Sequence, residues 1–214
     1  MASNIKIAVI VGTGKAGKYL VNQLIIKKYN FNILVRNPNH FTINTPLANV
    51  ITGNVNDPEI VQKLLKGCDV VISTLGIGIP PSERTIFSTA TTNVLKTMSK
   101  YGIGRYIVIT GLNVDTPADD KGTVTKAGTS WMYENYPIST RDRQDEYEML
   151  TESDTNWTLV RLPIIEQTDA AGQIAVSLTD CLGTTISATS LANFLISQIS
   201  DTAYIKQAPF IANK

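Results

Sequence analysis

The feature that most constrains this chain is a glycine-rich turn between two apolar runs. Residues 5–11 are mainly apolar, and a second apolar run occupies residues 31–35. Between them lie the turn and an amphipathic stretch over residues 18–25; the turn reads Gly12-Thr13-Gly14-Lys15-Ala16-Gly17. This order predicts a strand, a tight turn, a helix and a second strand that ends at Arg36.

Each glycine in the turn has a physical role in this context. Gly12 lets the chain leave the strand in a tight turn, Gly14 lets a pyrophosphate approach the backbone, and Gly17 lets the helix pack close to the sheet. The free N–H groups and the positive dipole end of the helix would then face the phosphates. The pattern therefore predicts dinucleotide binding by residues 12–17. The alternative is a glycine-rich turn that holds no ligand.

Arg36 favours NADP over NAD as the dinucleotide. In this kind of fold an acidic residue after the second strand binds the ribose 2′-OH of NAD, whereas an arginine there accommodates the 2′-phosphate of NADP. Residues 35–39 contain no Asp or Glu. A guanidinium can bind a phosphate through two hydrogen bonds, and a carboxylate would repel it. We expect NADPH to be preferred over NADH. The alternative is a solvated surface arginine.

Strand and helix patterns alternate along the rest of the chain. Strands are expected at residues 50–55, 68–76, 105–111 and 156–163, and helices at 59–66, 85–101 and 141–152. A weaker hairpin-like region, a helix at 190–199 and an edge strand at 204–211 follow. Such alternation with right-handed crossovers predicts an α/β fold with a Rossmann-like doubly wound parallel sheet. We expect a single domain over residues 1–214, with a small C-terminal region on the substrate side.

The segment of residues 112–140 interrupts this alternation. A segment of this length inside a compact domain is usually functional. Its aromatic residues, which include Trp131, Tyr133 and Tyr136, fit two structures. They would form a short helix that caps a pocket, or they would simply cover the end of the sheet.

Composition excludes several classes of function. Hydrophobic residues make up 43% and charged residues 17%, as in a globular protein, and the net charge of +1 with no strongly basic stretch argues against nucleic-acid binding. No apolar run approaches the roughly 18 residues of a membrane span, and the first residues lack a signal-peptide pattern. Cys68 and Cys181 have no metal-site spacing and are expected to be free thiols in a reducing cytoplasm. The lone His40 lies in a polar loop, so no metal site is expected.

Five segments carry a resemblance to a known family. They are the glycine turn, Arg36, and residues 53–58, 68–76 and 157–163. With this order and spacing, nearly the whole chain resembles the atypical short-chain dehydrogenases, the NAD(P)-binding group that includes biliverdin reductase B (a flavin reductase) and the NmrA-like proteins. The resemblance implies that the third strand ends at the adenine, the fourth at the cofactor ribose, and the sixth near the nicotinamide amide. These roles fall to Asn54, Val55, Thr74, Leu75, Gly76, Pro163 and Ile164. Asn54 replaces the family's usual Asp, and its amide can still accept and donate hydrogen bonds.

The catalytic residues of the family are less well matched. Its main branch uses a Tyr-x-x-x-Lys pair, in which the Lys lowers the pKa of the acidic Tyr. Here Tyr147 is followed four residues later by Thr151. Biliverdin reductase B places a serine just after the fifth strand and a histidine after the sixth, where this chain has Gly111 and Ile164. Thr110 supplies a hydroxyl one residue earlier, which would bind the substrate or the cofactor, or would only satisfy the backbone at the end of the strand. The candidate catalytic residues are therefore Thr110 and Tyr147.

Two functions are compatible with a cofactor site that lacks the usual acid. The first is an NADPH-binding oxidoreductase that transfers hydride to a flavin, a quinone or a similar small planar acceptor, which is then protonated from water. Arg141 and Arg143, on the helix of Tyr147, would hold an anionic or flat acceptor, or would only form surface ion pairs. The second is a non-catalytic NADP(H)-responsive sensor, as the NmrA-like relatives suggest. We expect the oxidoreductase.

Overall fold

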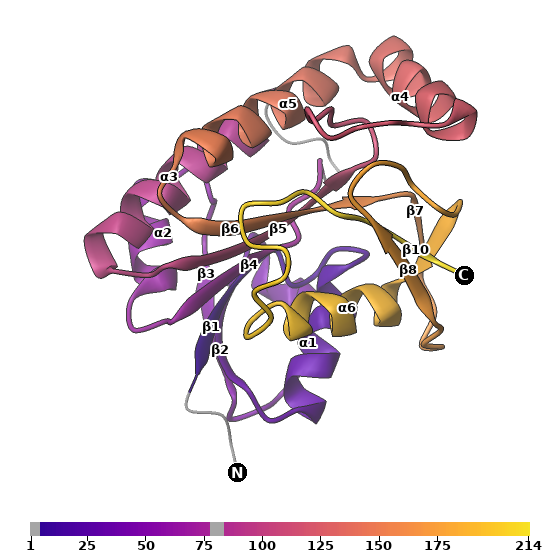
Figure 1. The fold of residues 1–214 in the computed structure, drawn as a ribbon. Helices are drawn as coiled ribbons and strands as arrows, with labels where there is room; N and C mark the ends of the chain where they lie inside the picture. The colour runs from indigo at the N-terminus through magenta and orange to yellow at the C-terminus, as the bar shows by residue number, and fades with distance from the viewer. Residues whose placement is uncertain (1–4, 78–83) are drawn as a thin grey trace.

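The computed structural model describes residues 5–77 and 84–214, which are organised around one large sheet. Its eight strands lie in the order β3-β2-β1-β4-β5-β6-β10-β8 (Figure 1). They are β1 (Lys6–Ile10), β2 (Asn30–Val35), β3 (Ala48–Thr52), β4 (Val70–Ser73), β5 (Arg105–Gly111), β6 (Asn156–Leu162), β8 (Ile174–Ser177) and β10 (Phe210–Asn213). All neighbouring strands are parallel except β8, which runs antiparallel to β10.

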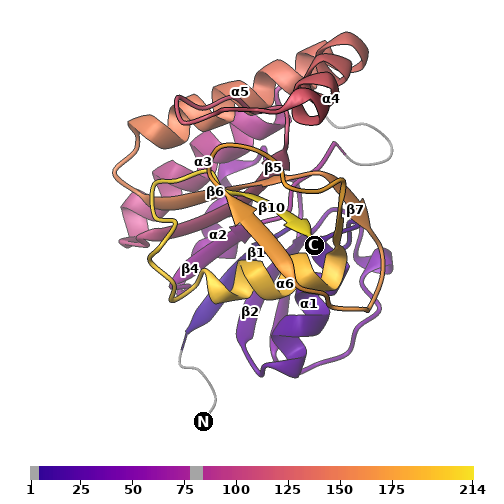
Figure 2. The same cartoon turned by 45° about the vertical axis from the view of Figure 1, so that its right-hand side comes forward.

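Helices cover both faces of this sheet (Figures 1 and 2). One face carries α2 (Pro58–Leu65), α3 (Ile86–Tyr101) and α5 (Pro137–Glu152), and the other carries α1 (Gly17–Ile26) and α6 (Ala188–Ser197). A further helix, α4 (Thr123–Asn135), packs beside α5, and a short 3-10 helix spans Pro38–His40. The prediction of a Rossmann-like doubly wound sheet is confirmed.

The apolar runs form central strands because both of their faces are buried. In β1, Ala8 and Ile10 belong to the core under α2, α3 and α5, whereas Ile7 and Val9 belong to the core under α1 and α6. Successive side chains of a strand point to opposite faces, so a strand between two helix layers is apolar on both faces at most positions. All four of these side chains are fully buried.

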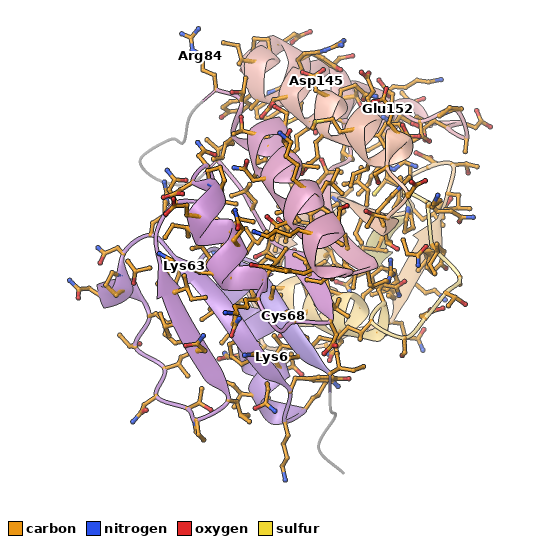
Figure 3. All side chains as sticks on the ribbon, turned by 90° about the vertical axis from the view of Figure 1, so that its left-hand side faces the viewer. Lys6, Lys63, Cys68, Arg84, Asp145 and Glu152 are labelled. Atoms are coloured by element: carbon orange, nitrogen blue, oxygen red, sulfur yellow. The ribbon has the colours of Figure 1, made fainter. Side chains whose placement is uncertain are left out.

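The face with α2, α3 and α5 is turned to the viewer in Figure 3, which labels the exposed Lys63 and Glu152 and the buried Cys68, just beyond the end of α2. Burial raises the pKa of the Cys68 thiol to about 11, so this group stays protonated near neutral pH. Both cysteines are free thiols. Within the described residues, no helix has the length and apolarity needed to cross a membrane.

The C-terminal part differs from the sequence prediction. The hairpin-like region does not form a hairpin: β7 (Ile164–Glu166) pairs in parallel with β9 (Thr185–Ser187) in a separate two-stranded sheet. The predicted edge strand is also wrong, because β10 lies inside the large sheet between β6 and β8. Before β10 begins, Lys206, Gln207 and Pro209 already form irregular backbone hydrogen bonds with β6. A pattern of apolar residues identifies a strand but not its neighbours.

A helix is found at the aromatic residues of 131–136, as one of the two expected structures required, but it is longer than predicted. Residues 131–135 form the end of helix α4 and Tyr136 caps it, and the rings of Trp131 and Tyr136 contact each other edge to face, with 5.7 Å between their centroids. Trp131 is 53% exposed and Tyr136 is 48% exposed. About half of each side chain is therefore in contact with solvent, and neither belongs to the described lining of the large cavity considered below.

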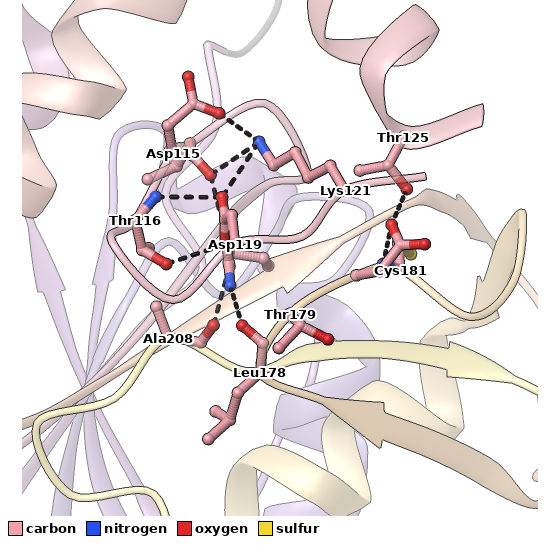
Figure 4. Close-up of polar contacts among 12 residues, drawn as sticks. Asp115, Thr116, Asp119, Lys121, Thr125, Leu178, Thr179, Cys181 and Ala208 are labelled. Carbon is pink, nitrogen blue, oxygen red and sulfur yellow. Dashed lines mark hydrogen bonds and ion pairs between the residues drawn. The ribbon is translucent and has the colours of Figure 1, made fainter. Parts of the chain in front are cut away.

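A buried ionic cluster attaches the 112–122 segment to the sheet (Figure 4). Arg161 on β6 has no exposed surface, and its Nη1 donates to Asp119 at 2.6 Å. The other groups of its guanidinium donate to the carbonyls of Ala208 and Leu178. Lys121 lies on the far side of Asp119, at 3.6 Å. One arginine thus connects three segments that are far apart in the sequence.

Candidate functional site

A cavity of about 1140 Å³ opens at the carboxyl ends of the parallel strands. It spans the point where the strand order reverses between β1 and β4. Ligands of doubly wound sheets bind in the crevice at such a reversal. The turn after β1 lies on one side of the cavity, and the ends of β5 and β6 lie on the other.

The three glycines of the turn have different surroundings. A Cβ at position 12 would overlap the side chain of Ile33, and one at position 17 would overlap the carbonyl of Val11. A Cβ at position 14 would meet only Val11 Cγ1, at an ordinary 3.6 Å. Gly12 and Gly17 are therefore required by packing, whereas Gly14 leaves open space on the side of the cavity.

Val11 holds a backbone conformation that is rare for a branched residue. Its φ is 61°, in the left-handed region that favours glycine. The hydroxyl of Thr74 donates to the Val11 carbonyl at 2.6 Å. Both residues line the cavity. Strained residues of this kind persist only where neighbours hold them, and they gather at ligand sites.

One end of the cavity is suited to anionic groups. Lys15, Lys18 and Arg36 line it, and α1 begins beside it at Gly17. The first turn of α1 contains no acidic residue, and no side chain caps it. The part of the lining that the structure describes includes no Asp or Glu. Cationic side chains and the N-terminus of a helix together attract phosphate.

The other end of the cavity combines apolar side chains with a buried hydroxyl. Ile77, Ile86 and Ile165 provide the apolar surface. Thr110, at the end of β5, is 3% exposed, and its hydroxyl has no hydrogen-bond partner among residues 5–77 and 84–214. Leaving a buried polar group without a partner costs about 1–3 kcal/mol. A polar group of a ligand would remove this cost.

Arg143 on α5 reaches the same end of the cavity. It is 9% exposed, its Nη2 donates to the carbonyl of Leu75, and its Nη1 donates to Glu146 at 2.6 Å. The guanidinium also stacks on Phe87, 3.3 Å from the ring centroid. Burial raises the pKa of Glu146, and the neighbouring Arg143 acts in the opposite direction. The guanidinium is therefore held rigidly in the cavity wall.

The two arginines considered in the sequence have different environments. Arg141 forms an exposed ion pair with Asp145 at 2.9 Å, as the surface alternative required. Arg143 pairs instead with the buried Glu146 and not with a surface carboxylate.

Asp142, between these two arginines, accepts hydrogen bonds from the backbone N–H groups of Phe87 and Ser88 at the start of α3.

Most of the residues predicted for the site lie along this cavity. They come from the ends of six strands, β1 to β6: Thr13, Gly14, Lys15, Ala16, Arg36, Asn54, Val55, Thr74, Leu75, Gly76, Thr110 and Pro163. Gly12 and Gly17 belong to the same turn, but they pack against the protein and are not part of the described lining. The cavity also includes Lys18, Arg143 and Gln167, which the motifs did not assign to it.

Two predicted residues lie elsewhere. Ile164 is 72% exposed, and its neighbour Ile165 lines the cavity instead. The ring of Tyr147 packs edge to face on Trp157, 6.0 Å between centroids, and does not belong to the described lining. Tyr147 and Arg143 are one helical turn apart on α5, but only Arg143 reaches the cavity.

Comparisons with known proteins agree with this geometry. A family model described as NAD(P)H-binding matches residues 12–202. A short-chain dehydrogenase/reductase from Veillonella parvula DSM 2008 in complex with NADP has a TM-score of 0.80 and 17% identity, covering 98% of this chain and 94% of that chain. An oxidoreductase from Lactococcus lactis has a TM-score of 0.76 and 18% identity, covering 98% and 91%. A Rossmann-fold NAD(P)-binding family protein from Shigella flexneri has a TM-score of 0.74 and 16% identity, covering 99% and 94%.

Proposed function

Because the chain belongs to the NAD(P)H-binding family, as its resemblance to the atypical short-chain dehydrogenases predicted, we propose that it is an NADPH-dependent oxidoreductase. The cofactor, when bound, supplies a hydride, and the acceptor is a flavin, a quinone or a similar small planar molecule. The observation that carries the proposal is the two-ended cavity at the reversal of strand order. Its cationic end suits phosphates, and its apolar end contains polar groups suited to a reacting ring.

The residues of the turn would hold the pyrophosphate. Gly14 leaves space at the backbone, and the start of α1 directs N–H groups toward the same space. Asn54 and Val55, after β3, would contact the adenine. Thr74, Leu75 and Gly76 would lie along the ribose of the reacting half, beside Pro163. A ligand that spans the cavity would exclude water from the apolar end.

Arg36 supports the preference for NADPH. It lies at the end of β2 and lines the cavity together with Asn37, and the described lining contains no carboxylate that would repel a phosphate. Replacing Arg36 with alanine should reduce the preference for NADPH over NADH by roughly 1.5–3 kcal/mol, the contribution of a charged hydrogen bond. Fluorescence titration with both cofactors measures this, and Lys63→Ala, an exposed cation on α2, serves as the matched control. Equal affinities for the two cofactors in the unmutated protein would contradict the preference.

The proposed transfer requires no side-chain acid. The phenol of Tyr147 is packed against Trp157, and burial raises its pKa. Thr110 offers one neutral hydroxyl. Tyr147→Phe and Thr110→Val should therefore each change flavin or quinone reduction by less than about tenfold, the lower limit for a positioned acid. A thousandfold loss in either variant, with cofactor binding intact, would identify the acid that the proposal omits.

The position of Tyr147 also favours the second candidate, an NADP(H)-responsive sensor without chemistry. NADPH consumption with FMN, riboflavin and menadione, each measured in separate assays, discriminates between the two. Sustained consumption supports the enzyme. If NADPH binds tightly but no acceptor is reduced, the oxidoreductase proposal is overturned and the sensor is favoured.

A further inference from the structure

We propose that Arg143 contacts the acceptor and that the acceptor is a conjugated ring carbonyl compound, whose oxygen becomes negatively charged when it gains hydride. This inference rests on the proposed oxidoreductase function and specifies the chemistry of its substrate. Quinones and flavins share the required group. Arg143 would stabilise this oxyanion. It would thus provide the stabilisation of developing charge that a side-chain acid provides in the main branch of the family.

The position of Arg143 is the first argument. Lys15, Lys18 and Arg36 line the cavity near the turn and the end of β2, whereas Arg143 comes from α5 on the side of Thr110 and Gly111. Its bond to the Leu75 carbonyl fixes it at the end of β4, beside the reversal of strand order. A reacting ring placed against Thr110 would therefore meet this guanidinium.

The second argument is that the guanidinium is held in place and still has donors to offer. Phe87 supports its face, and Leu75 and Glu146 accept from two of its nitrogens. A guanidinium has five N–H donors, so some of them have no partner within the described chain. Donors that are positioned before the reaction need no reorganisation when charge develops, and they act most strongly where water is excluded.

The third argument is the balance of charge. In the free protein Glu146 compensates Arg143, and Thr91 donates a further hydrogen bond to Glu146 at 2.9 Å. A buried charge is tolerated when it is paired in this way. No carboxylate of the described lining opposes a new negative charge on the cavity side of Arg143.

The step balances without a protein acid. The C–H bond of the dihydronicotinamide breaks, and the acceptor gains that hydrogen together with both bonding electrons, so NADPH is oxidised to NADP⁺ and the acceptor is reduced. The acceptor then has one additional negative charge, which its carbonyl oxygen carries against Arg143. Water supplies the proton after the transfer. Arginine remains protonated throughout, so it acts by charge and hydrogen bonding and not by proton donation.

The test compares two kinds of hydride acceptor. Menadione becomes an anion when it gains hydride, whereas the N-methylphenazinium cation becomes neutral. Replacing Arg143 alone would leave Glu146 buried without its partner, so the informative variant is Arg143→Met combined with Glu146→Gln. Its controls are Glu146→Gln alone, which keeps the guanidinium, and Arg141→Met, which removes the exposed arginine of the same helix. Circular dichroism and NADPH titration establish that each variant folds and binds cofactor.

The double variant should lose about 10²–10³-fold in kcat for menadione, the effect of removing one donor to a developing oxyanion. Its kcat for N-methylphenazinium and its affinity for NADPH should be unchanged, and Arg141→Met should resemble the unmutated protein. Glu146→Gln alone keeps the guanidinium but loses its ion pair, so it should lose less of the menadione rate than the double variant. Arg143→Lys, which keeps the charge but loses the planar fork, should recover part of the menadione rate. An unchanged menadione rate, or an equal loss with both acceptors, would overturn the role of Arg143 and leave the oxidoreductase function intact. If the unmutated protein reduces no acceptor, both proposals fail.

Discussion

Replacing Gly14 with valine is expected to abolish NADPH binding while the protein remains folded. A Cβ at this position meets only Val11 Cγ1, at 3.6 Å, so the substitution fits the free protein. The methyl groups would nevertheless fill the space that a pyrophosphate needs beside the start of α1. Titration with NADPH measures the loss, and thermal unfolding followed by circular dichroism establishes that the fold is retained.

Gly17→Val in the same turn is the matched control. Its Cβ would overlap the carbonyl of Val11 and the backbone of Gly12, so this variant should lose stability whether or not a ligand is added. Overpacking typically costs about 1–3 kcal/mol, and backbone cannot move aside as a side chain does. Normal NADPH binding by Gly14→Val would mean that the pyrophosphate lies elsewhere. An unfolded Gly14→Val would mean that the turn has less room than its geometry indicates.

Replacing Asp119 with alanine is expected to cost about 3–5 kcal/mol of unfolding free energy, because it leaves a buried charge unpaired. Arg161 has no exposed surface, and Asp119 is its carboxylate partner at 2.6 Å. Burial lowers the pKa of Arg161, and the hydrogen bond with Asp119 raises it. Urea denaturation of the two proteins measures the difference.

The control for this experiment is Asp145→Ala, which breaks the exposed pair with Arg141. Surface pairs of this kind contribute about 0–1 kcal/mol. A double replacement, Asp119→Leu with Arg161→Met, should recover much of the lost stability, since a buried pair can be exchanged for apolar groups of similar size. A loss below about 1 kcal/mol for Asp119→Ala would mean that water reaches Arg161 and that the ionic cluster is not shielded from solvent.

The fold could be predicted from the sequence where local signals and packing agree. The glycine turn, the Asp57-Pro58 start of α2 and the apolar runs of β1, β4 and β5 place these elements to within about three residues. The strands after β6 are short, and their partners are distant in the sequence: Ile164 pairs with Thr185 across a long connection. Apolar periodicity contains no information about such pairing, so the separate sheet and the interior position of β10 could not be foreseen.

The sequence predicted which backbone segments form the site better than it predicted which side chains face the cavity. Strand ends meet at one edge of a parallel sheet, and the family resemblance assigned positions at these ends, from Asn54 to Pro163, to the cofactor. Ile164 and Ile165 exchange roles because a slip of one residue reverses the face of a strand. On α5 the buried stripe includes Asp142, Arg143 and Glu146. A polar buried stripe is invisible to a search for hydrophobic periodicity, and for this reason Arg143 resembled a surface residue.

β10 is synthesised after every other strand of the sheet, although it lies inside it. Until residues 206–213 leave the ribosome, the edge of β6 lacks these hydrogen-bond partners, and Arg161 lacks the carbonyl of Ala208. Ribosomes add about 5–20 residues per second, so the time between the synthesis of β6 and that of residues 206–213 is on the order of seconds. An open strand edge is a template for pairing with other chains. Nascent molecules on neighbouring ribosomes are therefore expected to be most prone to aggregate in this interval, and a chaperone that covers the β6 edge should raise the yield of folded protein.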